Sequence, residues 1–134
     1  MKNIIIPLLM LIFYSGCEKE RFLINEENFE SRWLLIERYN DPGDGSGGFV
    51  SVSSNIMIDF STDGKFISNG NLCNFSIEVD TPTQGVKTKT DSSSQLHVEN
   101  CPDIVLHATF YSDNTMELYY PCIETCALKF KKIK

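Results

Sequence analysis

Residues 104–120 read IVLHATFYSDNTMELYY, and this stretch decides the fold. Apolar residues alternate with polar ones on both sides of a short polar segment, Ser112-Asp113-Asn114. Alternation with a period of two is typical of a strand with one buried face, and Asp and Asn tolerate the backbone angles of tight turns. The stretch therefore predicts two antiparallel strands joined by a hairpin turn. The side chains expected to face the core are Ile104, Leu106, Ala108, Phe110, Met116, Leu118 and Tyr120.

The same pattern recurs along most of the chain. Alternating segments separated by turn signals predict eight strands, at about 32–39, 55–61, 65–69, 86–90, 95–99, 104–111, 115–120 and 127–133. Asp63-Gly64 marks a hairpin between the second and third of them. A further stretch around Phe75, Ile77 and Val79 also alternates, so the fourth strand either begins earlier or is two strands. Short strands at this spacing predict an all-β sandwich or barrel.

Composition excludes several classes of protein. The chain has 134 residues, enough for one domain, and its 42% hydrophobic residues are too many for an intrinsically disordered chain. The formal net charge is −6. Binding to nucleic acid needs clustered Lys and Arg, so we expect no nucleic-acid partner. Five cysteines is an odd number for a small exported protein and requires an explanation.

The amino end explains the odd cysteine. Residues 1–16 contain one basic residue, an apolar run and then small residues, which is typical of a secretory signal peptide. The apolar run is shorter than the roughly 20 residues that a spanning helix needs. Tyr14-Ser15-Gly16-Cys17 resembles the lipobox of bacterial lipoproteins, which implies cleavage before Cys17, lipid on its sulfur and an outer-membrane anchor. The predicted division is a signal peptide at 1–16, a lipidated tether at 17–30 and a folded domain at 31–134.

Four cysteines remain after this cleavage, and an even number in an exported domain predicts two disulfides. They are Cys73, Cys101, Cys122 and Cys126. Because consecutive strands are antiparallel, the connections that hold these cysteines all lie at one end of the sheet. Three pairings are open, and the spacing slightly favours Cys122–Cys126 with Cys73–Cys101. No Cys-x-x-Cys pair occurs, so we expect neither a zinc site nor another cofactor.

Several motifs, in this order, resemble the bacterial lipocalin-like lipoproteins. They are Trp33, the Asp41-Pro42-Gly43-Asp44-Gly45-Ser46-Gly47 loop, FSTDGKF at 60–66, SNGNLC at 68–73 and YPCIETC at 120–126. The resemblance spans roughly residues 31–133 and implies an eight-stranded antiparallel up-and-down barrel. A barrel of this size is either packed solid or holds one small ligand. The candidates to line a ligand cavity are Trp33, Ile58, Phe60, Phe66, Phe110, Leu118, Tyr120 and Phe130.

No motif points to catalysis or to a metal. Loop 41–48 lacks the ligand spacing of an EF-hand, because Gly43 and Gly45 stand where ligands belong. His97 and His107 fall on the polar faces of strands, and neither has a positioned nucleophile in the pattern. Hydrolase, phosphate-loop and metalloprotease motifs do not occur. The sequence therefore predicts a protein that is not an enzyme.

Two functions remain as predictions. The first is a lipid-anchored envelope lipoprotein whose barrel binds a small apolar ligand. The alternative is a protein-interaction or inhibitor module that uses its disulfide-pinned rim loops, by analogy with small barrel lipoproteins that inhibit lysozyme. An acidic surface suits a basic partner. The expected partners are the membrane, through the anchor, and either a small hydrophobic ligand or an envelope protein.

Overall fold

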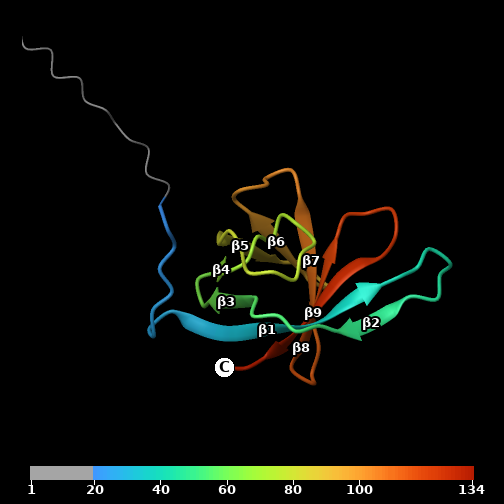
Figure 1. Cartoon of the computed structure of the whole chain (residues 1–134). Coiled ribbons are helices and arrows are strands. Elements are labelled where there is room, and N and C mark those ends of the chain that lie inside the picture. Colours follow the sequence, from blue (N-terminus) through green and yellow to red (C-terminus); the bar gives the residue numbers. More distant parts are fainter. Residues whose placement is uncertain (1–19) are drawn as a thin grey trace, which may run out of the picture.

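The computed structural model describes residues 20–134 (Figure 1). The predicted signal peptide and Cys17 lie outside these residues. Nine strands follow one another along the described chain: β1 (Phe29–Asn40), β2 (Gly48–Ser51), β3 (Met57–Ser61), β4 (Lys65–Ser68), β5 (Thr83–Lys89), β6 (Ser94–Val98), β7 (Val105–Phe110), β8 (Thr115–Tyr120) and β9 (Cys126–Lys132). Between residues 20 and 134 there is no helix of the length and apolarity that crossing a bilayer requires.

Eight of these strands form a closed antiparallel barrel. From β3 to β9 each strand pairs with the next, while β1 pairs with β3 along one edge and with β9 along the other. Closure lets β1 and β9 bond to each other, so neither strand is left as a free edge. This confirms the predicted all-β, eight-stranded antiparallel barrel in which neighbours in sequence are neighbours in space.

The remaining strand, β2, lies beside the end of β1, which continues past β3. Its four residues pair with residues 37–40 at the end of β1, and the two strands make a projecting hairpin (Figure 1). Sequence alternation did not reveal β2, because both of its faces are largely exposed and it needs no apolar side. The Gly-rich segment expected to be only a loop is therefore partly a strand.

The stretch around Phe75, Ile77 and Val79 is not a strand, and β5 begins at Thr83. Phe75 and Ile77 pack against the core from a connection, whereas Val79 is exposed. Their alternation thus reflects packing on one end of the barrel and not pairing with a neighbouring strand.

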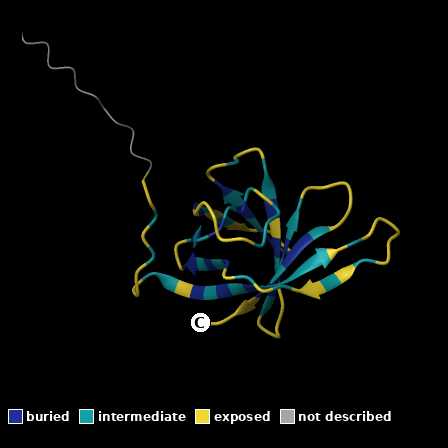
Figure 2. Ribbon diagram, in the orientation of Figure 1, coloured by how far each residue is buried: buried dark blue, intermediate teal, exposed yellow. Residues whose placement is uncertain are grey.

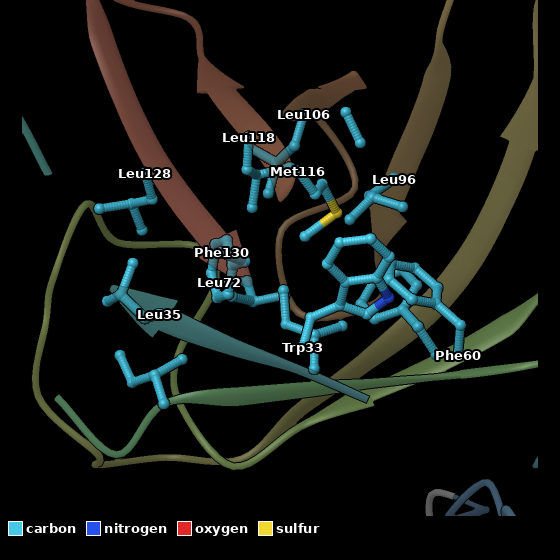
Figure 3. Close-up of a cluster of buried hydrophobic side chains, with 14 of the residues drawn as sticks. Trp33, Leu35, Phe60, Leu72, Leu96, Leu106, Met116, Leu118, Leu128 and Phe130 are labelled. Carbon is cyan, nitrogen blue, oxygen red and sulfur yellow. The ribbon is translucent and has the colours of Figure 1, made fainter. Parts of the chain in front are cut away.

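Inward-facing side chains fill the barrel (Figure 3), and the buried residues lie along the barrel strands (Figure 2). The buried cluster consists of Trp33, Leu35, Ile56, Ile58, Phe60, Phe66, Leu72, Leu96, Val98, Leu106, Ala108, Met116, Leu118, Leu128 and Phe130. Seven barrel strands contribute to it, and β5 instead presents the buried Gly85 to the core beside Phe66. Burial of this apolar surface is the main force that favours the folded state.

The alternating strand directions give the barrel two different ends. The tight turns at 62–64, 90–93 and 111–114 lie at one end, which we call the turn end. Gly64 (φ 82°) and Asn114 (φ 63°) supply the left-handed backbone of two of these turns. The connections at 41–47, 69–82, 99–104 and 121–125 lie at the other end, which we call the rim.

Candidate functional site

Two disulfides fasten the connections of the rim. Cys73 in connection 69–82 is bonded to Cys101 in connection 99–104, with their Cα atoms 5.9 Å apart. Cys122 is bonded to Cys126 and closes a small ring around connection 121–125. The four cysteines therefore meet at one end of the barrel, in the pairing that their spacing favoured. Disulfides of this kind are typical of extracytoplasmic proteins.

Connection 69–82 covers the mouth of the barrel at the rim. Its Leu72 side chain points into the core and is only 1% exposed (Figure 3). The Thr83 hydroxyl donates a hydrogen bond to the Gly70 carbonyl (2.7 Å) and accepts one from the Leu72 N–H (3.2 Å). Together with the Cys73–Cys101 bond, these contacts fix the connection over the mouth.

Most candidates for a ligand cavity pack against one another and not around a space. Trp33 is 5% exposed, and the cavity candidates with 0% exposure are Ile58, Phe60, Phe66, Leu118 and Phe130. A void that accepted even one water would leave exposed surface on the side chains around it. The Phe60 and Phe66 rings are in contact, with centroids 6.2 Å apart. These residues leave no room for a ligand between them.

Phe110, another cavity candidate, lies at the turn end of the barrel. Its ring packs edge-on against Trp33, with the centroids 5.3 Å apart. The Lys87 ammonium lies 5.5 Å from the Phe110 ring centroid and 3.1 Å from the Glu30 carboxylate. A cation stacked on an aromatic ring and paired with a carboxylate thus covers this end.

Tyr120, the last cavity candidate, lies under the rim. Its ring packs edge-on against Phe75, with centroids 5.4 Å apart. The hydroxyl is buried and has no hydrogen-bond partner within the described part of the chain, and burial raises the pKa of Tyr120. A buried hydroxyl without a partner costs free energy. Packing of the Tyr120 ring therefore stabilises the fold at this position, whereas burial of its hydroxyl destabilises it.

The rim connections carry acidic side chains and no basic ones. They contain no Lys, Arg or His, and their carboxylates are Asp41, Asp44, Glu78, Asp80, Glu99, Asp103 and Glu124. Hydrogen bonds from Ser46 lower the pKa of Asp44, which keeps this carboxylate ionised. The nearby Arg38 belongs to β1, and its guanidinium lies 4.3 Å from the ring centroid of Phe75. Charge at the turn end is mixed, as in the pair of Asp63 and Lys65.

Connections 41–47 and 121–125 project from the barrel (Figure 1), and we call the two loops together the rim ridge. A Cβ atom at Gly43 would lie 3.8 Å from Oε1 of Glu124, so the two loops lie side by side. Both loops are largely exposed (Figure 2), and Ile123 in the disulfide ring is fully exposed. Sequence reasoning gave Ile123 no role. The available signal was a lone apolar residue inside a loop of polar residues closed by two cysteines.

The other sequence candidates do not form a site. Each aspartate of loop 41–48 accepts a hydrogen bond from a backbone N–H two residues further on, at 2.8 and 2.9 Å. His97 and His107 lie on neighbouring strands, and a His97 ring nitrogen is 3.2 Å from the Thr88 hydroxyl. From residue 20 onward, no three His, Cys, Asp or Glu side chains are grouped as metal ligands would be.

A groove of about 1060 Å³ lies outside the barrel, between the start of the described chain and strands β1, β3, β4 and β5. Gln84 holds that part of the chain, because it accepts a hydrogen bond from the Phe22 N–H (2.9 Å) and donates one to the Glu20 carbonyl (2.6 Å). Arg32, on the groove floor, is bonded to both carboxylate oxygens of Asp59, at 2.7 and 2.6 Å. Part of the predicted tether therefore lies against the barrel.

Comparison with known proteins does not assign a family. No protein-family model matches this chain, and no curated protein matches its sequence. Among solved structures, an uncharacterized protein from Bacteroides eggerthii DSM 20697 is similar over 75% of this chain and 97% of its own, with 17% sequence identity and a TM-score of 0.45.

Proposed function

We propose that this protein is a lipid-anchored envelope lipoprotein with a lipocalin-like barrel, and that its rim binds a cationic protein. One contrast carries the choice of partner. The barrel interior is filled by side chains, whereas the rim connections carry seven carboxylates and no basic residue. The other predicted function, binding of a small apolar ligand inside the barrel, would need space that this interior does not offer.

The rim combines features that favour recognition of a protein. Exposed apolar side chains lie there among the carboxylates, namely Ile123, Val50 on the projecting hairpin and Val79. Interfaces pair a few apolar contacts with complementary charge, which also steers the partners together. The two disulfides restrict the loops before any partner arrives, so less conformational entropy is lost on binding.

Two matched variants test this proposal, because they change the net charge equally at different places. The rim variant combines Glu78→Gln, Asp103→Asn and Glu124→Gln. The control variant, away from the rim, combines Glu26→Gln, Glu27→Gln and Asp91→Asn. All six side chains are exposed, so neither variant should disturb the core.

The probes are two cationic proteins, hen lysozyme and cytochrome c, with acidic serum albumin as a negative control. Association is measured by biolayer interferometry at ionic strengths of about 0.02 M and about 0.15 M, because salt screens exposed charges. We expect the association rate of the rim variant with at least one cationic probe to fall about threefold or more, and that of the control variant to match the wild type. Equal losses in both variants, or no binding to either cationic probe, would contradict the proposal.

The membrane anchor is proposed at Cys17, on the basis of the lipobox resemblance. Metabolic labelling with palmitate in a bacterial host should mark the wild type and not the Cys17→Ala variant. Undiminished labelling of the variant would exclude lipid at this residue. Fractionation of the envelope should place the labelled protein in the outer membrane.

We also propose that the protein is not an enzyme. His97 and His107 are on the outer side of the barrel, and the paired cysteines are not available as nucleophiles. Hydrolysis of ester, peptide or glycoside test substrates by the purified protein, lost on substitution of either histidine, would refute this.

A further inference from the structure

The disulfide ring of the rim ridge presents one apolar side chain to solvent. Cys122 and Cys126 are four residues apart in sequence, and their bond leaves the intervening backbone little freedom. Ile123 within the ring is fully exposed, so nothing in the described part of the chain covers it. Apolar surface of this kind contributes nothing to stability until a partner buries it.

The neighbouring loop 41–47 carries two aspartates on a backbone that hydrogen bonds hold in place. The backbone turns at Gly43 (φ 94°) and Gly45 (φ 77°), where a side chain would be strained. Asp41 and Asp44 each use one carboxylate oxygen to bond the loop backbone. With Glu124 from the disulfide ring, the two loops of the rim ridge thus carry three carboxylates and one fully exposed isoleucine.

We propose that the rim ridge inserts into a cleft of a cationic protein, with Ile123 entering an apolar pocket and the three carboxylates meeting basic residues at the cleft edge. This rests on the proposed function and adds the anchoring residue and the concave shape of the partner. Ile123 is exposed on all sides, so only a partner surface that surrounds the side chain can bury it fully. The negative charge of the ridge selects a positively charged cleft. Its ordered backbone keeps the entropic cost of insertion low.

The first experiment compares Ile123→Ala with Ile133→Ala. Ile133 is also an exposed isoleucine, at 51%, and lies near the carboxyl end, away from the rim. The probe is hen lysozyme, a cationic protein with an open cleft. An anchor in a desolvated pocket governs dissociation, so Ile123→Ala should dissociate about tenfold faster with little change in association rate. Ile133→Ala should behave as the wild type.

The second experiment blocks the cleft. Chitotriose, which occupies the lysozyme cleft, should displace the wild-type protein, and binding to cytochrome c, which has no open cleft, should be weaker and insensitive to Ile123→Ala. If the rim charge variant weakens binding to lysozyme but Ile123→Ala and chitotriose do not, cleft insertion is wrong and the proposed function stands. If neither cationic probe is bound, both proposals fall.

Discussion

Gly85 is the place in the barrel where a side chain has the least room. It pairs with Phe66 of β4 and with Val98 of β6, and it faces the core. A methyl group at this position would lie 1.9 Å from the His97 carbonyl oxygen and 2.8 Å from Cζ of Phe66. Ordinary contact begins near 3.4 Å, so for Gly85→Ala the two strands would have to separate by about 1.5 Å.

The cost of Gly85→Ala follows from this separation. Moving β5 from β6 by so much breaks ladder hydrogen bonds at that point, since such bonds weaken beyond about 3.2 Å. Two lost bonds contribute about 1 kcal/mol each. Overpacking of the core adds about 1–3 kcal/mol. A total of about 3–5 kcal/mol is a large part of the roughly 5–15 kcal/mol that stabilises a domain. At about 4–8 °C per kcal/mol, the Tm should fall by about 12 °C or more.

Gly48→Ala is the matched control for this prediction. Gly48 begins β2, and a Cβ atom there would meet nothing within 4 Å. Because alanine also restricts the unfolded chain, this variant should be unchanged or more stable by up to about 1 kcal/mol. Thermal and urea unfolding followed by circular dichroism measure both variants. A Gly85→Ala protein that melts within about 3 °C of the wild type would refute the packing argument.

Three further predictions concern the rim and the turn end. Replacing Cys73 and Cys101 together by serine should lower the unfolding free energy by about 3.5 kcal/mol, from the length of the loop that the bond closes; a loss below about 1 kcal/mol in urea unfolding would contradict this. Tyr120→Phe removes a buried hydroxyl without a partner and should raise the unfolding free energy by about 1 kcal/mol, seen as a higher urea midpoint; a clear loss of stability would reveal an unrecognised partner. The Ser61 hydroxyl lowers the pKa of Asp63 from its ordinary 3.8, so the stability from this contact is present above that pH and is lost as pH falls below it. Asp63→Asn should therefore reduce the fall in the urea midpoint between about pH 5 and about pH 3, and an unchanged fall would exclude the contact.

The barrel could be predicted because its signals are local. Alternation at Phe60 and at Phe66 places each side chain on the inner face of its own strand, whatever the rest of the chain does. The Asp63-Gly64 turn joins those strands within a few residues. β2 was missed for the complementary reason. It buries no face, and its pairing with β1 is visible only when the backbone is in place.

Whether the barrel is packed solid or hollow could not be predicted from the sequence, because it depends on how the volumes of the inward-facing side chains fit together in three dimensions. The aromatic candidates lie in the interior of the barrel or at its ends, and nothing in the sequence distinguishes a set that fills the barrel from one that surrounds a cavity. Leu72 fills part of the interior. It belongs to a connection and not to a strand, so no alternation shows that it enters the core. Lys87 likewise covers the turn end through contacts with Glu30 and Phe110 that only the fold brings together.

The covalent structure of the rim bears on the choice between carrying a ligand and recognising a protein. A ligand that entered the barrel at the rim would have to displace connection 69–82. That connection is bonded through Cys73 to Cys101, tied to β5 through Thr83 and inserted into the core by Leu72. Each of these contacts stabilises the closed mouth, so opening it would cost the fold much of its stability before any ligand was bound. The proposed binding of a protein on the outer surface of the same rim would not require this opening of the fold, because Ile123 and the acidic loop are already exposed and ordered.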